Sequence, residues 1–281
     1  MNSQTTVLSY QDRELITENI EKTFSTDPVE GFKLLQSYEN HASQDLKRDL
    51  LATAWRIALN SADKKLRQKL INYLLNALHG ETDFLQGQSL KFLLDFTPSD
   101  FDDRAINILL NLPLSGDHCG ESIRLIGIAN IRSREAALSE ISSGFFKKTM
   151  KSTYYASCEW AASLALSRFG DIESSKQVIA QVENESDITI RATRLFADIA
   201  YMRQPLAFDA LRSYLHSKAR LPQVKDSVPG ALEAIYAAEL FAKYIEGCPI
   251  AGPDVYEKDI VPITQWADAQ TIWEFREQPI P

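Results

Sequence analysis

Apolar residues recur every three or four positions along almost the whole chain, and strict alternation of apolar and polar residues is nearly absent. This spacing is typical of amphipathic helices, whose apolar side chains return to one face after each turn. Two successive stripes are Leu46, Leu50, Leu51, Ala54, Ile57 and Ala58, and then Leu66, Leu70, Leu74, Ala77 and Leu78. The pattern predicts an all-α protein whose helices are joined by short polar segments.

The expected helices fall into pairs. These pairs are expected at 10–40, 45–79, 83–112, 118–145, 150–184 and 187–216, followed by a helix near 229–245. Pro28, Pro98, Pro205 and Pro229 each fall where a helix should begin. Proline is favoured at that position because its missing backbone N–H would have no helical partner there. The chain should therefore contain about six helical hairpins.

The chain is also similar to itself at regular intervals. The matches are 123–131 with 164–172 (a shift of 41), 162–170 with 192–200 (a shift of 30) and, more faintly, 90–93 with 123–126 (a shift of 33). Periods of roughly 30–45 residues with two helices each indicate stacked helical repeats.

The stretch 154–171, YYASCEWAASLALSRFGD, is rich in alanine and serine. Small side chains allow neighbouring helices to approach within about 8–10 Å. Gly170 can end the helix in a left-handed conformation, and Asp171 can begin the next one. Residues 159–171, together with Ile190-Arg191-Ala192-Thr193, resemble a HEAT repeat, in particular the alanine-rich subclass of phycobilin-lyase-like proteins.

This resemblance covers residues 118–216 and implies a right-handed α–α superhelix, a HEAT-like solenoid. We expect the solenoid to occupy residues 1–247. Residues 248–281 combine several prolines with aromatic side chains, and we expect them to form a cap, because a terminal repeat otherwise leaves one apolar face bare. The alternative is a regulatory lid over the more basic middle repeats.

Charge is unevenly distributed along the chain, whose net charge is −8. Residues 1–120 carry 12 basic and 17 acidic side chains, residues 121–230 carry 15 and 12, and residues 231–281 carry 3 and 9. A nucleic-acid-binding domain is usually strongly basic, so nucleic acid is not the expected partner. The acidic ends favour a basic protein partner.

Several features predict a cytoplasmic protein. No apolar run approaches the length of a membrane span, and the first residues lack the basic start and apolar core of a secretory signal. Cys119, Cys158 and Cys248 lie far apart and form no CxxC motif. We therefore expect buried free thiols in a reducing compartment, and no contact with a membrane.

Catalytic and metal-binding motifs are not found. The four histidines are His41, His79, His118 and His216, and they lack the repeated His-Glu pairs of the HEAT-like metal hydroxylases. Asp117-His118-Cys119 could hold a metal or an active thiol, but three adjacent loop residues rarely point at one atom. No GxSxG, Walker or GxGxxG motif occurs. We expect a non-enzymatic protein without a metal or cofactor.

Trp55 and Trp160 suggest one alternative. HEAT-like DNA glycosylases hold a damaged base with aromatic side chains and a carboxylate on the concave face. Trp160 with Glu159 could imitate that arrangement, and Arg191 and Arg194 could contact phosphates. We favour the simpler interpretation that Trp160 fills the gap between repeats beside its alanine neighbours.

The second helix of each HEAT pair usually lines the concave face, which predicts a polar stripe available to a partner. Its residues are Asn107, Asn111, Ser139, Glu140, Gln177, Gln181, Asp209, Ser213 and His216. The stripe is mainly neutral to acidic, and it could bind an extended segment or a basic surface. The alternative is an ordinary solvated helix face.

The expected function is a protein–protein interaction scaffold. A narrower hypothesis is a bacterial cytoplasmic antagonist such as a toxin-immunity protein, which rests on fold analogy and the acidic balance. The rival hypotheses are a HEAT-like DNA-lesion glycosylase or nucleic-acid-binding protein, and a phycobilin-lyase-like enzyme partner. The sequence leaves the partner, the oligomeric state and the binding face open.

Overall fold

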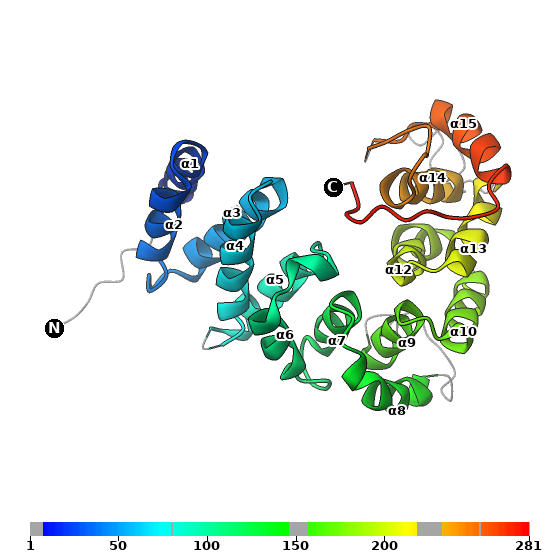
Figure 1. The fold of residues 1–281 in the computed structure, drawn as a ribbon, viewed down its shortest axis with the longest axis horizontal. Helices are drawn as coiled ribbons and strands as arrows, with labels where there is room; N and C mark the ends of the chain where they lie inside the picture. The colour runs from blue at the N-terminus through cyan, green and yellow to red at the C-terminus, as the bar shows by residue number, and fades with distance from the viewer. Residues whose placement is uncertain (1–7, 80, 146–156, 218–231, 253, 281) are drawn as a thin grey trace. The chain divides into compact units, whose positions relative to one another are not determined.

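The computed structural model describes residues 8–79, 81–145, 157–217, 232–252 and 254–280. Helices dominate these residues, and no β-strand occurs among them; an isolated antiparallel bridge joins Ile245 and Phe275 (Figure 1). The predicted all-α class is confirmed. The chain divides into two compact units, Met1–Ile131 and Arg132–Pro281. None of the helices in the described ranges is long and apolar enough to cross a lipid bilayer.

The first unit is a series of helices in which successive pairs pack together. Its elements are α1 (Tyr10–Thr26), α2 (Pro28–Ser37), α3 (Gln44–Asn60), α4 (Lys64–Asn76), α5 (Asp83–Leu93), the 3-10 turn η1 (Pro98–Asp100), α6 (Asp103–Leu110) and α7 (Cys119–Ile128). Helix α3 packs against α1, α4 and α5, and α5 packs in turn against α7. The apolar stripes of α3 and α4 are buried by these contacts.

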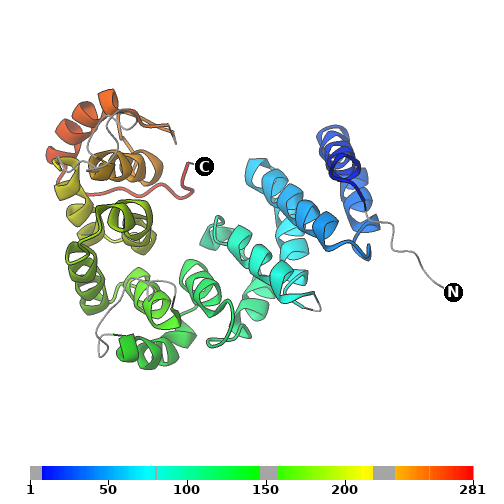
Figure 2. The ribbon, with the colours of Figure 1, turned by 180° about the vertical axis from the view of Figure 1, so that it is seen from behind.

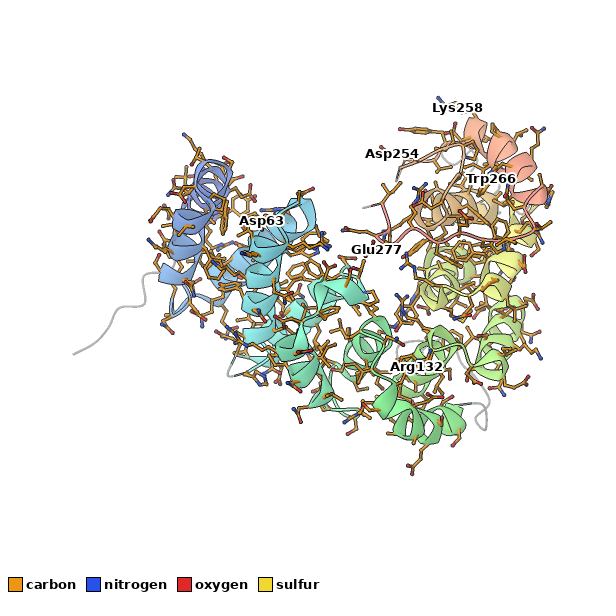
Figure 3. All side chains as sticks on the ribbon, in the orientation of Figure 1. Asp63, Arg132, Asp254, Lys258, Trp266 and Glu277 are labelled. Atoms are coloured by element: carbon orange, nitrogen blue, oxygen red, sulfur yellow. The ribbon has the colours of Figure 1, made fainter. Side chains whose placement is uncertain are left out.

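Polar side chains set several helix starts in this unit. The hydroxyl of Ser9 accepts a hydrogen bond from the backbone N–H of Asp12, and the Asp12 carboxylate accepts one from the N–H of Ser9. Asp63, labelled in Figure 3, accepts from the N–H of Lys65 at 2.8 Å and so caps α4. Such caps satisfy backbone donors that the first turn of a helix leaves unbonded.

The second unit contains the remaining helices. Its elements are the 3-10 turn η2 (Arg132–Arg134), α8 (Glu135–Phe145), α9 (Cys158–Arg168), α10 (Ile172–Glu183), α11 (Ile188–Ile190), the π-helical turn η4 (Arg191–Leu195), α12 (Phe196–Met202), α13 (Pro205–Leu215), α14 (Leu232–Tyr244) and α15 (Glu257–Asp268). Figure 2 shows α14 beside α12, α13 and α15 from the side opposite to Figure 1, and these four helices pack on one another.

Four of the expected hairpins pack as pairs: α1 with α2, α3 with α4, α9 with α10, and α12 with α13. The hairpin expected at 118–145 is divided, because α7 belongs to the first unit and α8 to the second, where α8 packs on α9. Pro28 and Pro205 begin α2 and α13, and Pro98 begins η1, as expected. Pro229 lies outside the described residues. The total of six hairpins stays a prediction.

Small residues place α9 at the centre of the second unit. Every residue from Trp160 to Ser167 is buried, including Ala161, Ala162 and Ala165. Helix α9 packs against α8, α10 and α12. Larger side chains at the three alanines would hold these neighbours apart, so the small residues serve packing.

The turn after α9 forms as the sequence predicts. Gly170 has a φ of 98°, a left-handed conformation that a side chain would disfavour. Asp171 then accepts a hydrogen bond from the N–H of Ser174 at 2.9 Å and caps α10. The Gly-Asp pair therefore ends one helix and begins the next.

Three arginines, which we call the arginine ladder, link successive helices of the second unit: Arg132, Arg168 and Arg203. Arg132 donates to the carbonyl oxygen of Phe169 at 2.7 Å, and its guanidinium lies 5.5 Å from the centre of that ring. Arg168 donates to the carbonyl oxygen of Tyr201 at 2.5 Å and lies 5.1 Å from the Tyr201 ring. The same kind of contact thus occurs at sequence separations of 37 and 33 residues.

The third rung of the ladder reaches the C-terminal segment. Arg203 donates to the carbonyl oxygens of Arg276 and Glu277, and its guanidinium lies 5.8 Å from the centre of the Tyr244 ring. Burial, and then the neighbouring charge of Arg168, lowers the pKa of Arg203 to about 10. Burial also lowers the pKa of Arg168. Fixed carbonyl dipoles and ring faces compensate these buried cations in place of carboxylates.

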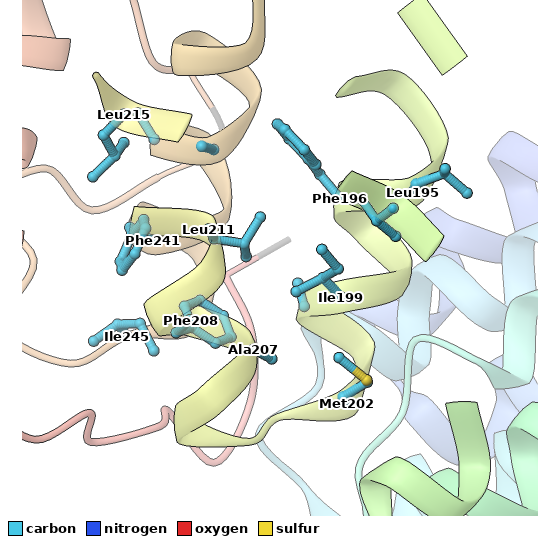
Figure 4. Close-up of a cluster of buried hydrophobic side chains, with 14 of the residues drawn as sticks. Leu195, Phe196, Ile199, Met202, Ala207, Phe208, Leu211, Leu215, Phe241 and Ile245 are labelled. Atoms are coloured by element: carbon cyan, nitrogen blue, oxygen red, sulfur yellow. The ribbon is translucent and has the colours of Figure 1, made fainter. Parts of the chain in front are cut away.

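A large hydrophobic cluster of the second unit lies between α12, α13 and α14. Figure 4 shows Phe208 and Leu211 of α13 between Ile199 of α12 and Phe241 of α14. The rings of Phe208 and Phe241 meet edge to face with centroids 5.3 Å apart. Edge-to-face contact is a favoured geometry for aromatic pairs.

Residues after Gly247 complete this cluster. Trp273 is 6% exposed, and its ring centroid lies 5.1 Å from that of Phe241 and 6.1 Å from that of Trp266. Helix α15 was not expected, because Pro262 lies inside it. Its start carries a local signal, since the Asp259 carboxylate accepts from the N–H of Tyr256 at 3.0 Å.

Candidate functional site

The predicted polar stripe reaches the surface at most of its positions. Exposed residues are Asn107, Asn111, Ser139, Glu140, Gln177, Asp209, Ser213 and His216, and Gln181 is half-buried. Asn107 and Asn111 lie at the end of α6 in the first unit, and the others lie on or next to α8, α10 and α13 in the second. Because α10 packs against α13, these two helices bring their part of the stripe together.

The C-terminal segment occupies part of α13. Asp209 accepts a hydrogen bond from the indole N–H of Trp273 at 3.0 Å, and the ring of His216 lies 3.1 Å from a carboxylate oxygen of Asp268. Arg212 donates to the carbonyl oxygen of Gln270 at 3.1 Å. Asp209 and His216 therefore have intramolecular partners, which the sequence did not indicate because 52 or more residues separate each pair.

The face of α10 carries the remaining stripe residues of this helix pair. Gln177 is exposed beside Lys176, whose ammonium group pairs with Glu173 at 3.0 Å. Ile172, at the start of α10, is 62% exposed. An apolar side chain beside neutral and charged groups has the mixed composition of a protein interface.

Trp160 lies in the core and does not line a concave surface. It is 0% exposed, and its indole N–H donates to the carboxylate of Asp198 on α12 at 2.7 Å. Trp160 packs between neighbouring helices, as the simpler interpretation expects; that these helices are repeats stays a prediction. A buried indole cannot stack on a flipped base, so Trp160 does not support the glycosylase hypothesis.

Arg191 also binds partners inside the protein. Its guanidinium pairs at 2.6 Å with Glu233, a carboxylate that is 2% exposed, and it lies 5.6 Å from the centre of the Tyr214 ring. The hydroxyl of Ser217 donates to the other oxygen of Glu233 at 2.5 Å. Arg194 is exposed. The two arginines therefore do not form a joint phosphate site.

Trp55 lies on the first unit and is half-exposed. Its indole N–H donates to Asp95 at 3.1 Å, and its ring stacks on Phe92 with centroids 5.1 Å apart. This arrangement joins α3 to α5 and its C-terminal end. Its contacts are accounted for by packing between neighbouring helices.

The residues of Asp117-His118-Cys119 point to different partners. His118 has a left-handed φ of 59°, and its Nε2 lies 2.9 Å from the carbonyl oxygen of Asp83. Asp117 is exposed, and Cys119 is buried. Within the described ranges no three His, Cys, Asp or Glu side chains converge as a metal site requires.

The cysteines differ from the expectation of three free thiols. Cys119 and Cys158 are disulfide-bonded, whereas Cys248 is a buried free thiol whose pKa is raised by burial. The expectation of free thiols was therefore wrong for Cys119 and Cys158.

Comparison with known proteins adds no relative to this geometry. No protein-family model matches the chain, and neither a curated protein nor a solved structure matches it. The HEAT resemblance of residues 118–216 stays a prediction from the sequence.

Proposed function

We propose that this chain is a HEAT-type solenoid that binds a protein partner through the second helices of its repeats. The repeat part of the proposal is supported by side-chain contacts at similar sequence separations. Arg132 contacts Phe169 across 37 residues, and Arg168 contacts Tyr201 across 33. Contacts at a near-constant separation are what stacking of successive repeats produces.

The burial of α9 carries the binding part of the proposal. Residues Trp160–Ser167 are buried, and most of α12 is buried as well, so a partner can reach these repeats only through α10 and α13. The C-terminal segment engages Asp209 and His216 on α13. The exposed face of α10 around Gln177 is therefore the most accessible part of the stripe in this helix pair.

A rigid helical face suits this function. Helices held by a buried core lose little conformational entropy when a partner docks, so more of the contact energy appears as affinity. Glu140, Glu173 and Glu183 are exposed acidic residues on α8 and α10, which favours a basic partner surface. A bacterial toxin-immunity protein is a narrower form of the same proposal, and it requires neutralisation of a co-encoded toxin.

The test is complex formation with stripe variants. Tagged protein is used to capture partners from a nuclease-treated lysate of its source, and a captured protein is then purified and mixed with Glu140→Lys or Gln177→Lys in size-exclusion chromatography with light scattering. We expect a stoichiometric complex that either substitution weakens at least tenfold. Asp209 is left intact because its carboxylate holds Trp273.

The matched control is Glu257→Lys on α15, which makes the same charge change as Glu140→Lys at another exposed site of the second unit. If Glu140→Lys and Glu257→Lys weakened binding equally, the effect would come from the net charge of the protein and not from the stripe. Failure of every stripe variant to change binding would contradict the proposed face.

A further inference from the structure

A polar cavity of about 260 Å³ lies in the first unit, where the C-terminal ends of α2 and α4 meet the starts of α3 and α5. Its lining residues are Glu39, Asn40, Lys47, Leu51, Tyr73, Asn76, Ala77, His79, Glu81 and Leu85. None of them belongs to the predicted stripe. The cavity is smaller than the roughly 300–1,000 Å³ of pockets for drug-sized ligands, so its size suits one side chain or a comparable small molecule.

The cavity has an apolar floor and a polar mouth. Leu51, Ala77 and Leu85 are buried, whereas Asn76 and His79 are exposed. A ligand with a short hydrocarbon stem and a polar head would match both regions, since binding pockets combine apolar walls with a few polar groups that fix orientation.

Tyr73 is the unusual member of this lining. The residue is 9% exposed, and its side chain forms part of the cavity wall. Burial, and then the charges of Glu39 and Glu81, raises the pKa of the hydroxyl, so both carboxylates lie near it on the cavity side. A hydroxyl on the cavity wall beside two carboxylates can accept a hydrogen bond from an occupant that carries N–H groups.

The charges in the cavity leave one carboxylate available. Glu81 pairs with the ammonium group of Lys47 at 2.6 Å. Glu39 forms no ion pair within the described part of the chain, and its carboxylate is half-buried. The cavity thus has a net negative charge and several oxygen acceptors: two on Glu39, the second oxygen of Glu81 and the Tyr73 hydroxyl.

We propose that this cavity binds an alkylguanidinium group, with Glu39 pairing its charge, Tyr73 accepting one N–H and Leu51 and Leu85 holding its methylene stem. A guanidinium has five N–H donors in a planar fork and can satisfy more of these acceptors than the three donors of an ammonium group. This inference does not depend on the proposed function of the second unit.

The test uses the full chain and N-acetyl-arginine N-methylamide as the probe, with saturation-transfer NMR and calorimetry as readouts. We expect Glu39→Gln to weaken binding by about 10- to 100-fold, the effect of losing a charged hydrogen bond. Tyr73→Phe should weaken binding by several-fold, because it removes one hydrogen-bond acceptor of the site. The lysine analogue should bind more weakly than the arginine probe.

Glu18→Gln is the matched control. Glu18 lies in a separate acidic groove with Glu14 and Glu21, so its substitution removes the same charge from the same unit without touching the cavity. The proposal is overturned if the probe does not bind, if Glu18→Gln weakens binding as much as Glu39→Gln, or if the lysine analogue binds equally well.

Two further probes distinguish the sources of the guanidinium. Agmatine presents it as a free small molecule, and the capped peptide Gly-Gly-Arg-Gly-Gly presents it as a protein side chain. Tighter binding of the peptide would assign the cavity to an arginine of a partner protein, and tighter binding of agmatine to a free ligand. Either result retains the guanidinium site.

Discussion

The two units link their successive helices by different chemistry. In the first unit, cations pair with carboxylates: Arg13 with Asp49 at 2.9 Å and Arg67 with Asp100 at 2.7 Å. In the second unit, the arginine ladder donates to backbone carbonyl oxygens and lies over aromatic rings. The sequence separations are similar, 36 and 33 residues for the two ion pairs and 37 and 33 for the first two rungs.

The difference lies in what each link requires of the sequence. An ion pair needs a complementary residue at the right position in the next repeat, and removing one partner leaves a charge behind. A carbonyl acceptor is present at every residue, so the hydrogen bond of a rung needs only an arginine and a suitable backbone, although the contact with the ring also needs an aromatic residue. The second unit can therefore vary its sequence opposite each arginine with less effect on the hydrogen bond.

Both units leave apolar side chains exposed at their outer helices; in the second unit, Tyr256, Val261 and Ile272 on or next to α15 are 59% exposed or more. Tyr10, Leu15 and Val29 on α1 and α2 are 58% exposed or more. In the second unit, Trp273 and Phe275 pack on Phe241 and Phe208. The second unit thus depends on its last residues for a complete core.

Trp273→Ala should give the largest effect. The substitution removes a buried indole from the aromatic cluster, and Asp209 loses the hydrogen bond that this indole donates to it. We expect it to lower the free energy of unfolding by about 3–5 kcal/mol. Hydrogen exchange measured by mass spectrometry should show the loss of protection in peptides of α13, α14 and α15. Trp273→Phe keeps most of the ring contact and should cost less; equal losses from both variants would contradict a packing role for the indole.

Arg67→Met should give the next largest effect. The side chains of Arg67 and Asp100 are only 10% and 12% exposed, so the substitution leaves a largely buried carboxylate without its cation. We expect a loss of about 3 kcal/mol in urea unfolding, at the lower end of the range for breaking a buried pair. Adding Asp100→Asn should restore part of that loss, because it removes the uncompensated charge. A double variant less stable than Arg67→Met would contradict this account.

The sequence predicts local features better than distant contacts. Proline and small polar caps fix the starts of α2, α10 and α13, and the Gly170-Asp171 turn forms as expected, because these features depend on neighbouring residues. Trp160 was placed in the core from the small residues around it. Helix α15 is not predicted from the sequence, because Pro262 argues against a helix there. The capping signal at Tyr256 and Asp259 is the local feature that indicates it.

The candidate sites depend on contacts that no local pattern reports. Glu39 and Tyr73 are 34 positions apart and carry no motif, yet both line one cavity. Asp209 was expected to face a partner, but it accepts from Trp273, 64 residues away. Such pairs are set by how the helices pack, and the apolar periodicity predicts the helices without their side-chain partners.

Substitutions along the arginine ladder should have graded and smaller effects than Arg67→Met. Arg168→Met keeps a stem of similar length, loses the bond to the Tyr201 carbonyl and leaves no charge behind, so we expect a loss of about 1–3 kcal/mol. Arg132 is exposed, and Arg132→Met should cost less than about 1 kcal/mol.

Urea unfolding of both variants, alone and in 1 M NaCl, measures which substitution lowers the free energy of unfolding more. Because Arg168 is half-buried and its acceptor is a neutral carbonyl, salt should change the stability loss of Arg168→Met little. If salt removed most of the Arg168→Met loss, the contact would be an ionic one like those of the first unit, and the contrast between the two units would fail.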